Sequence, residues 1–269
     1  MNELNPQVFY LITKRGPLDT VMVTVIGAIK AYANTKKIQV VLPEEGGYVG
    51  ADDSAIVITI GGDGTALEGF KLGAQIGIPI ITVNLGTLGF LADIAPEVVV
   101  DRIDDILKGE HILEERMALS DGYENLAANE FYISHAEVGR LFRYSVYVDG
   151  ILASEQGSDG VIIATPTGST AYSLAAGGAI LSPAMKAIQV VPVAPHTLTG
   201  RPLIVSCKSK VEIEPHSSYY VKADGRIIHD YPIPEKVRIM TNTRNPIKIL
   251  HPKPWNFYSV LEDKLSWTL

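Results

Sequence analysis

A carboxylate stands among three glycines in the stretch IGGDGT (60–65), which directly follows the apolar run AIVITI (55–60). Glycines between a strand and a helix let a ligand approach free backbone N–H groups, and such groups bind anions. Beside a phosphate, the Asp63 carboxylate is useful if it accepts a proton from an attacking hydroxyl or contacts Mg²⁺. Both roles belong to phosphoryl transfer. A tight turn with Asp63 as a local cap is the alternative.

The residues around Asp63 define the kind of loop. We expect Gly61, Gly62 and Thr65 to form a phosphate loop, with Thr65 as the N-cap of a helix over 66–76 that Gly77 closes. The loop lacks the Lys-Ser/Thr ending of a P-loop, and its glycine spacing differs from the dinucleotide-binding fingerprint.

A second group of polar residues lies in SDGVIIATPTGSTAYSLAAGG (158–178). A short apolar strand leads into a turn and a helix of small residues. The hydroxyl groups exceed what helix capping requires, so they could bind ribose, phosphate or base edges, and Tyr172 offers a ring for stacking. A hydroxyl-rich turn with a capped helix is the alternative. These side chains are Thr165, Thr167, Ser169, Thr170, Tyr172 and Ser173.

Two different patterns of elements must position these motifs. Up to about residue 110, apolar strands at 7–13, 37–42, 55–60 and 78–83 alternate with helical patterns at 18–33, 66–76 and 96–109. This alternation predicts a parallel sheet covered on both faces. Short strands then recur, which predicts a β-rich sandwich or barrel with one helix near 170–177. An amphipathic helix should end the chain and pack on another element.

We therefore expect two domains. An α/β domain spans residues 1–108, with 255–269 packing back on it, and a β-rich domain spans 109–254.

Composition limits the possible functions. The chain has 269 residues, 46% of them hydrophobic, and a formal net charge of −7, which argues against a nucleic-acid partner. Cys207 is the single cysteine, so no internal disulfide can form. No signal pattern and no apolar run of about 20 residues occurs. We expect a cytoplasmic protein with no membrane partner.

Six motifs in order carry a family resemblance. They are GGDGT (61–65), NLGTLGFLADI (84–94), ERMAL (115–119), NE (129–130), TPTGSTAYSLAAGG (165–178) and APHTLTGRPLIV (194–205). Together, from about residue 55 to the end, they resemble the NAD kinase family. GGDGT alone would also fit lipid or sphingoid kinases, but the long threonine-rich motif does not.

The resemblance implies a fold and a reaction. The family has an N-terminal α/β domain, a C-terminal β-rich domain and a chain end that returns to the first. Its members transfer the terminal phosphate of ATP, or of polyphosphate in some, to the adenosine-ribose 2′-hydroxyl of NAD, giving NADP. We therefore expect a kinase that uses NAD and ATP or polyphosphate, with Mg²⁺ accompanying ATP. We also expect a homodimer or homotetramer, in which neighbouring subunits reach into the site.

The resemblance also implies roles for individual residues. Asp63 is the general base that takes the 2′-hydroxyl proton, and Gly64 lies against the dinucleotide. Asn129 and Glu130 match the pair that contacts adenine and ribose. The other implied NAD-binding residues are Arg140, Asp159, Thr170, Ala171, Tyr172, Ser173 and Ala194.

Departures from the family pattern leave other functions open. Glu68 stands where many relatives carry a basic residue, and Gly157 stands where many carry a basic or polar one. Both changes remove positive charge that could bind the phosphates of the donor, so they bear on the affinity of the donor site. An NAD(P)-binding regulator on the kinase scaffold is therefore an alternative. His196 and Ser169 could suggest a hydrolase, but no G-x-S-x-G motif is present. The histidines show no metal-ligand spacing, so we expect no metal site made by protein groups alone.

Overall fold

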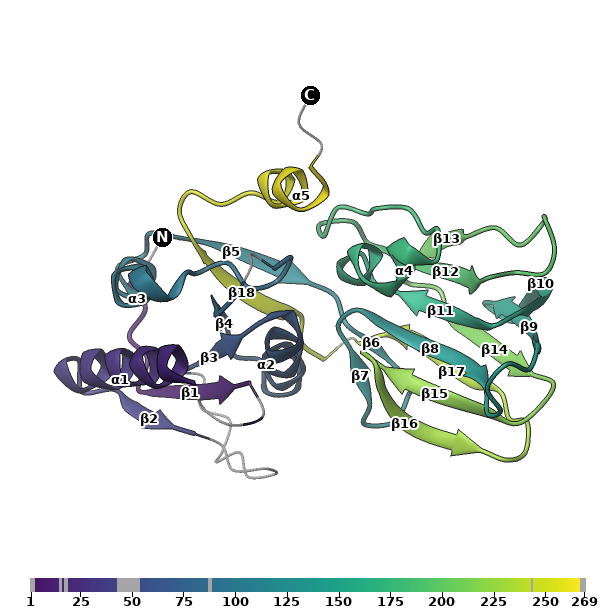
Figure 1. The fold of residues 1–269 in the computed structure, drawn as a ribbon, viewed down its shortest axis with the longest axis horizontal. Coiled ribbons are helices and arrows are strands. Elements are labelled where there is room, and N and C mark those ends of the chain that lie inside the picture. Colours follow the sequence, from purple (N-terminus) through teal and green to yellow (C-terminus); the bar gives the residue numbers. More distant parts are fainter. Residues whose placement is uncertain are drawn as a thin grey trace. The chain divides into compact units, whose positions relative to one another are not determined.

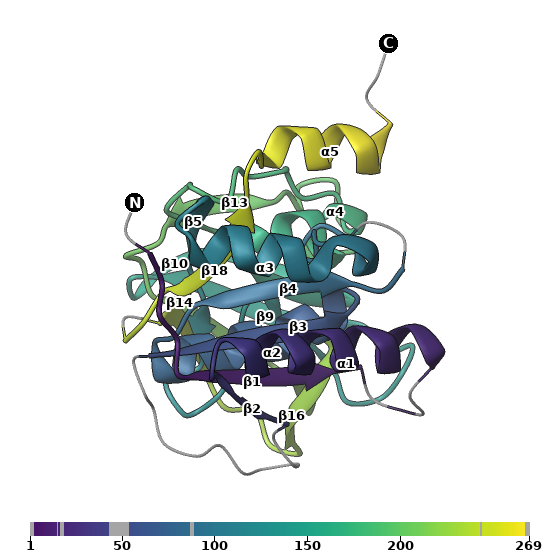
Figure 2. The same ribbon diagram turned by 90° about the vertical axis from the view of Figure 1, so that its left-hand side faces the viewer.

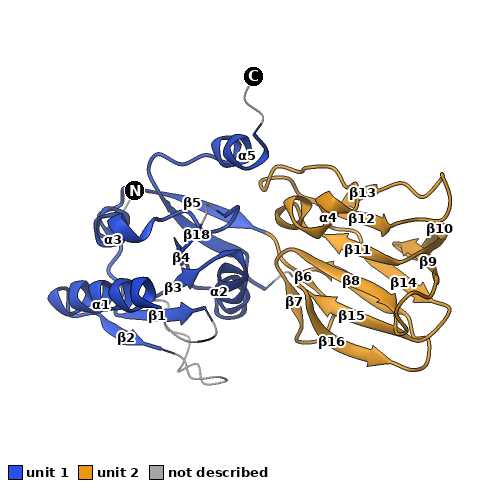
Figure 3. Cartoon of the chain, in the orientation of Figure 1, with its two compact units in different colours: residues 1–116, 244–269 blue, residues 117–243 orange. Residues whose placement is uncertain are grey.

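The computed structural model describes residues 3–14, 16, 19–42, 54–86, 89–242 and 244–266. The chain forms two compact units, residues 1–116 with 244–269 and residues 117–243, which Figure 3 shows in blue and orange. The change in sequence pattern predicts residues 109–116 and 244–254 in the second domain. In the structure they belong to unit 1, because their strands complete its sheet.

Unit 1 is built on a six-stranded sheet of order β2-β1-β3-β4-β18-β5 (Figure 1). Strand β5 pairs antiparallel with β18, and the other pairings are parallel, as predicted. The buried, apolar β3 and β4 lie at the centre. The strands are β1 (Val8–Thr13), β2 (Gln39–Val41), β3 (Ala55–Gly61), β4 (Ile80–Asn84), β5 (His111–Arg116) and β18 (Ile247–Pro252).

Helices cover both faces of this sheet, as predicted (Figures 1 and 2). Helices α1 and α3 lie on one face, where their apolar sides share a core with β1, β3 and β4. Helix α2 packs on the opposite face, against β3, β4 and β18. The helices are α1 (Thr20–Thr35), α2 (Asp63–Ile76), the 3₁₀ turn η1 (Pro96–Val98), α3 (Val99–Leu107) and α5 (Phe257–Leu265).

Two glycines set the distance between α2 and the sheet. A Cβ at Gly69 would collide with the Thr59 side chain, and one at Gly73 would collide with Ile80. The missing side chains let the helix backbone approach the strands closely. The helix ends at Gly77, whose φ of 82° is the left-handed conformation expected of a C-cap glycine. This packing fixes the helix N-terminus at the end of β3.

Unit 2 consists of two antiparallel six-stranded sheets of orders β10-β9-β14-β17-β6-β7 and β13-β12-β11-β8-β15-β16 (Figure 1). Side chains from both sheets form one apolar core, so the sandwich prediction is confirmed over the barrel. The helix expected near 170–177 is a 3₁₀ turn, η2 (Thr167–Thr170), followed by the short α4 (Tyr172–Ala175).

The strands of the first sheet are β6 (Leu119–Ser120), β7 (Leu126–Ala127), β9 (Phe142–Val148), β10 (Ile151–Ser158), β14 (Val211–Pro215) and β17 (Val237–Thr241). Those of the second are β8 (Glu130–His135), β11 (Gly160–Ala164), β12 (Ala187–Val193), β13 (Leu203–Ser206), β15 (Tyr219–Ala223) and β16 (Arg226–Tyr231). No helix in the described ranges is long and apolar enough to cross a membrane.

Candidate active site

The glycine loop of unit 1 starts its helix earlier than the sequence predicted. Helix α2 begins at Asp63, and Gly62 is its N-cap in an extended conformation. The prediction of Thr65 as N-cap is therefore wrong. The amides of Thr65 and Ala66 already donate to the Gly62 carbonyl, at 2.9 and 3.1 Å, so Thr65 lies in the first turn, where it is buried.

The three glycines of the loop serve different purposes. A Cβ at Gly61 would collide with the Thr65 side chain, so this glycine makes room for Thr65. Gly62 and Gly64 are exposed, and an added Cβ at either would meet no described atom within 4 Å. The backbone at the start of α2 is thus accessible to a ligand, and helix N-termini favour anions.

The Asp63 carboxylate is held by two backbone amides. The Phe90 N–H donates to Oδ2 at 3.0 Å, and the Leu91 N–H donates to Oδ1 at 3.1 Å. Gly89 permits this contact, because a Cβ there would collide with the carboxylate. Each carboxylate oxygen has a further lone pair, so Asp63 can still accept from a ligand. Residues 87–88 of this motif lie outside the described residues.

Metal binding at this loop would need oxygen atoms from a ligand. Within the part of the chain that the structure describes, no group of three or more His, Cys, Asp or Glu side chains could hold a metal ion. Mg²⁺ is commonly held by one or two carboxylates together with substrate phosphates. Asp63, half-buried beside an accessible helix N-terminus, fits the role of such a carboxylate.

In unit 2, Asp224 fixes the backbone of the Asn129–Glu130 pair. Its carboxylate accepts from the amides of Ala128 (3.0 Å), Asn129 (2.8 Å) and Glu130 (3.2 Å). Asn129 and Glu130 are buried, with 9% and 7% of each residue exposed. Sequence reasoning missed Asp224. It begins an Asp-Gly turn with φ of 47°, and that dipeptide signals a turn without revealing its distant partners.

The threonine-rich turn also supports Asn129. The Thr165 hydroxyl donates to the Ala128 carbonyl at 2.6 Å and accepts from the Gly168 amide at 3.0 Å. The Thr165 amide donates to the Asn129 carbonyl at 2.9 Å. Gly168 lies directly against Asn129, since an added Cβ would collide with the Asn129 backbone. The NE motif (129–130) and the threonine-rich motif (165–178) are thereby joined in one local structure.

Several hydroxyls of this turn bind the protein itself. Ser169 donates to the Pro166 carbonyl at 2.6 Å and accepts from the Leu181 amide at 2.9 Å. Ser173 is fully buried and accepts from the Gln189 side chain at 2.7 Å. Turn formation therefore uses more of the hydroxyls than the sequence pattern predicts. The more accessible members of the predicted set are Thr170, Ala171 and Tyr172, with Tyr172 42% exposed.

Tyr132 on β8 links Tyr172 to Asp159. The rings of Tyr132 and Tyr172 meet edge to face with centroids 5.3 Å apart. The Tyr132 hydroxyl donates to the Asp159 carbonyl at 3.4 Å, and Gly160 leaves space for its ring. Burial, together with Tyr172, raises the pKa of Tyr132 to about 12, so the hydroxyl stays protonated. Sequence reasoning did not select Tyr132, which looks like an ordinary strand residue.

The remaining predicted residues of unit 2 are Arg140, Asp159 and Ala194. They lie at the opposite end of the β13-β12-β11-β8-β15-β16 sheet from Asn129 and Glu130. In the β8–β11 register Glu130 faces Ala164 and Ser134 faces Gly160, a separation of about 13 Å along the strand. Asp159 precedes Gly160, and its amide donates to the Val193 carbonyl at 2.9 Å, so Ala194 follows on the neighbouring strand.

At that end, Ala194 has an unusual backbone conformation and Arg140 is exposed. Ala194 has a φ of 46°, which is uncommon for a residue other than glycine and marks a constrained backbone. Arg140 is exposed in the loop between β8 and β9 and pairs with Glu137 at 3.1 Å. The structure thus divides the predicted NAD-binding residues of unit 2 into two groups.

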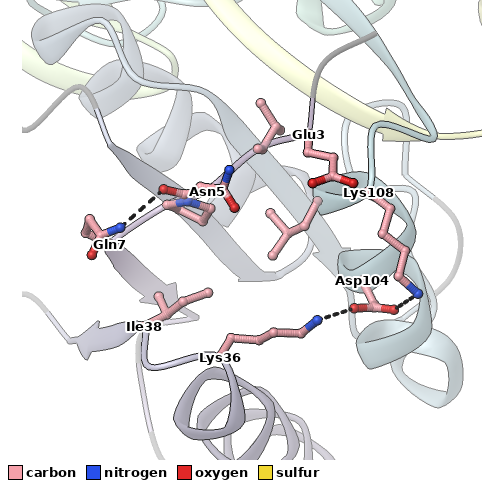
Figure 4. A pocket seen from close by; sticks show the side chains of 10 residues that line it. Glu3, Asn5, Gln7, Lys36, Ile38, Asp104 and Lys108 are labelled. Atoms are coloured by element: carbon pink, nitrogen blue, oxygen red, sulfur yellow. Dashed lines mark hydrogen bonds and ion pairs between the residues drawn. The ribbon is translucent and has the colours of Figure 1, made fainter.

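Two cavities lie away from the predicted residues. One, of about 330 Å³, lies in unit 1 beside Asp104, whose carboxylate binds Lys36 at 3.1 Å and Lys108 (Figure 4). The other, of about 450 Å³, lies in unit 2 beside His229 and Asp121, whose side chains are 3.1 Å apart. Among the described residues, neither lining includes one that the motifs selected.

Comparisons with known proteins agree with the motifs. The family models for the ATP-NAD kinase N-terminal and C-terminal domains match residues 44–111 and 128–251. An NAD kinase from Thiobacillus denitrificans is 37% identical over 229 residues, covering 81% of this chain and 78% of its own. An NAD kinase from Laribacter hongkongensis is 40% identical over 222 residues, covering 79% and 76%.

Solved structures show the same fold. Yeast NADH kinase complexed with NADH has a TM-score of 0.82 at 24% identity, covering 99% of this chain and 89% of its own. An NAD kinase from Archaeoglobus fulgidus in complex with ATP has a TM-score of 0.79 at 21% identity, covering 96% and 98%. With both family models matched and relatives at 37% identity or more over about four fifths of its length, the chain belongs to the NAD kinase family.

Proposed function

We propose that this protein is an NAD kinase that transfers the terminal phosphate of ATP to the adenosine-ribose 2′-hydroxyl of NAD, giving NADP. The observation that carries the proposal is the fixed Asp63 carboxylate. It lies at the accessible N-terminus of α2, and two backbone amides orient it. Family membership supplies the reaction, and this carboxylate supplies the group that the reaction needs.

As the 2′-hydroxyl oxygen attacks the terminal phosphorus of ATP, Asp63 accepts the hydroxyl proton, and the bond from that phosphorus to the bridging oxygen breaks, releasing ADP. The amides of Phe90 and Leu91 hold the carboxylate in one orientation, so little rotational freedom is lost when the hydroxyl binds. Positioning matters more than base strength here, because the transition state of phosphoryl transfer is loose. The open backbone at Gly62 and Gly64 lets the phosphates and the dinucleotide approach. Mg²⁺, which we propose is held by phosphate oxygens near Asp63, would neutralise charge on the transferred group.

NAD recognition falls to the predicted residues of unit 2. The Asn129 amide can pair with an adenine edge, and the Glu130 carboxylate can accept from ribose hydroxyls. Asp224 supports both by fixing their backbone. Thr170 and Ala171 lie in the accessible part of the turn that faces the dinucleotide, the buried Ser173 supports this turn, and the exposed Tyr172 ring stacks on the dinucleotide.

The second group of unit 2 residues, Arg140, Asp159 and Ala194, also binds NAD in this proposal. They lie at the opposite end of the sheet from Asn129 and Glu130. In a homodimer or homotetramer, a neighbouring subunit would contribute further residues to the site. We propose this assembly and a cytoplasmic location, with polyphosphate as an alternative phosphate donor.

The decisive experiment measures NADP formed from NAD and Mg-ATP, with polyphosphate in a parallel reaction. We expect NADP from the wild type and a loss of turnover of about 10²-fold or more in Asp63→Asn, the scale of removing a general base. In Asp63→Asn the side-chain NH₂ group faces one of the two backbone N–H groups and cannot accept a hydrogen bond from it. The NAD dissociation constant and the melting temperature are therefore measured as well, to show whether binding or folding changes. Unchanged turnover would remove Asp63 from the mechanism.

The alternatives give different results in the same assay. A regulator on the kinase scaffold would bind NAD without forming NADP from either donor. A lipid or sphingoid kinase would ignore NAD.

A further inference from the structure

A buried cluster of charged side chains lies in unit 1, outside the glycine loop. His251 on β18 is 2% exposed. Its Nδ1 lies 2.7 Å from Asp93 Oδ2, and its Nε2 lies 3.1 Å from Glu114 Oε2. Arg116 is also buried and donates from Nε to the same oxygen of Glu114 at 2.6 Å. The Trp255 ring stacks on the imidazole at 3.8 Å.

The contacts of His251 determine its protonation state. A neutral imidazole has one N–H, whereas both ring nitrogens of His251 face carboxylate oxygens. Both hydrogen bonds form only with the imidazolium. Burial works against the charged ring, but Asp93 and Glu114 together hold the pKa of His251 above its ordinary value. With Arg116, the cluster contains two acids and two bases, so its buried charges compensate one another.

Asp93 connects this cluster to the loop that holds Asp63. Its Oδ1 accepts from the Thr82 hydroxyl at 2.9 Å, and its Oδ2 binds His251. The next residue, Ile94, pairs with β4 by donating to the Thr82 carbonyl at 3.1 Å. Two and three residues before Asp93 are Leu91 and Phe90, the amides that orient Asp63. An anchor at Asp93 therefore restrains the short segment that carries both donors.

We propose that His251 is a positioning residue, which through Asp93 anchors the loop whose Phe90 and Leu91 amides orient the Asp63 carboxylate. The structural part of the proposal concerns the loop alone. The effect on turnover rests on the kinase function proposed above. A shift of about 1 Å in a reacting group can reduce a rate by about 10²-fold, so a loosened loop lowers kcat while NAD binding persists.

The structural part is tested by amide hydrogen exchange in the segment 84–94. His251→Gln is compared with His111→Gln, a matched control. His111 is also a buried histidine of unit 1, and its ring bonds the Ile106 carbonyl at 2.9 Å instead of a carboxylate. We expect exchange at Phe90 and Leu91 to accelerate at least tenfold in His251→Gln and to stay near the wild-type rate in His111→Gln. Equal protection in the two variants overturns the proposal.

A measurement on the unmodified protein covers the case in which His251→Gln fails to fold. In the ¹⁵N spectrum of labelled wild-type protein at pH 7.5, we expect one of the six histidines to carry protons on both ring nitrogens while exposed histidines are neutral. Assignment to His251 follows from through-space contacts to the Trp255 ring. A His251 ring without a proton on Nδ1 at that pH overturns the proposal, because its hydrogen bond to Asp93 would then be unmade.

Kinetics tests the functional part. We expect kcat to fall 10- to 100-fold in His251→Gln with the KM for NAD within about twofold of wild type, and Asp93→Asn to add little to that loss. A large rise in KM with unchanged kcat would contradict a positioning role. If the wild type forms no NADP, the proposed function fails, and the exchange experiment still decides whether His251 anchors the loop.

Discussion

Gly89→Ala tests whether the orientation of Asp63 determines turnover. A Cβ built at Gly89 would lie 1.9 Å from Asp63 Oδ1 and 2.8 Å from Cγ. Ordinary contact begins at about 3.4 Å, so the carboxylate must move by roughly 1 to 1.5 Å. A displacement of that size gives about a 10²-fold loss of kcat. The lost hydrogen bond to a charged group costs about 2 kcal/mol, so the fold persists.

The assay is steady-state NADP formation, with thermal melting as a check on folding. Gly86→Ala is the matched control, because it lies in the same loop and an added Cβ there would meet no described atom within 4 Å. We expect the control to retain turnover within about threefold of wild type. Wild-type kcat in Gly89→Ala, or an equal loss in both variants, would refute the argument that the close approach of Gly89 sets the position of Asp63.

Three further predictions follow from individual contacts. Asp224→Ala leaves three backbone N–H groups without their carboxylate and should destabilise unit 2 by roughly 3 kcal/mol in urea unfolding, whereas Asp224→Asn retains part of this. Tyr172→Ala should weaken NAD binding about tenfold by calorimetry, and Tyr172→Phe should not. The raised pKa of His251 means that its stabilisation is complete below about pH 6.5 and is lost as pH rises through the folded-state pKa. Melting curves of His251→Gln should therefore lack this alkaline loss of stability. Against the effect of burial, the His251 hydrogen bond and the Arg116 charge hold the pKa of Glu114 below its usual range, so the stabilisation it gives is present above about pH 4.5 and is lost as pH falls through the folded-state pKa.

The sequence predicted the two-unit fold because its main signals are local. Apolar strands alternating with helices indicated the parallel sheet, and short strands separated by turn residues indicated the sandwich. The start of α2 was predicted too late, because Thr65 is a good N-cap residue and Gly62 offers no side chain to recognise. Its position is set instead by close packing at Gly69 and Gly73, which a capping pattern does not report.

The candidate site could be predicted in part for the same reason. Asp63 is visible among glycines, but Phe90 and Leu91 reach it through backbone amides, which every sequence contains. Asp224 acts on residues 94 to 96 positions earlier, and no local pattern records that separation. The hydroxyls of the threonine-rich turn were assigned mainly to ligand binding. Ser169 and Ser173 instead satisfy buried groups of the protein, since a sharp turn under a sheet leaves many donors to pair.

The two departures from the family pattern, Glu68 and Gly157, lie in different units, and Glu68 shares helix α2 with Asp63. Glu68 follows it by five residues, which places the two side chains about 140° apart around the axis of α2 and directs Glu68 away from the face of Asp63. At Gly157 an added Cβ would make ordinary contact with Leu141 at 3.5 Å, so space does not explain the missing side chain. Gly157 pairs across the strands with the exposed Arg143, and cross-strand neighbours lie about 5 Å apart. Arg143 therefore puts a positive charge on the strand beside Gly157, where the family resemblance leads us to expect a basic or polar side chain, and this supports the proposed kinase over a regulator that only binds NAD.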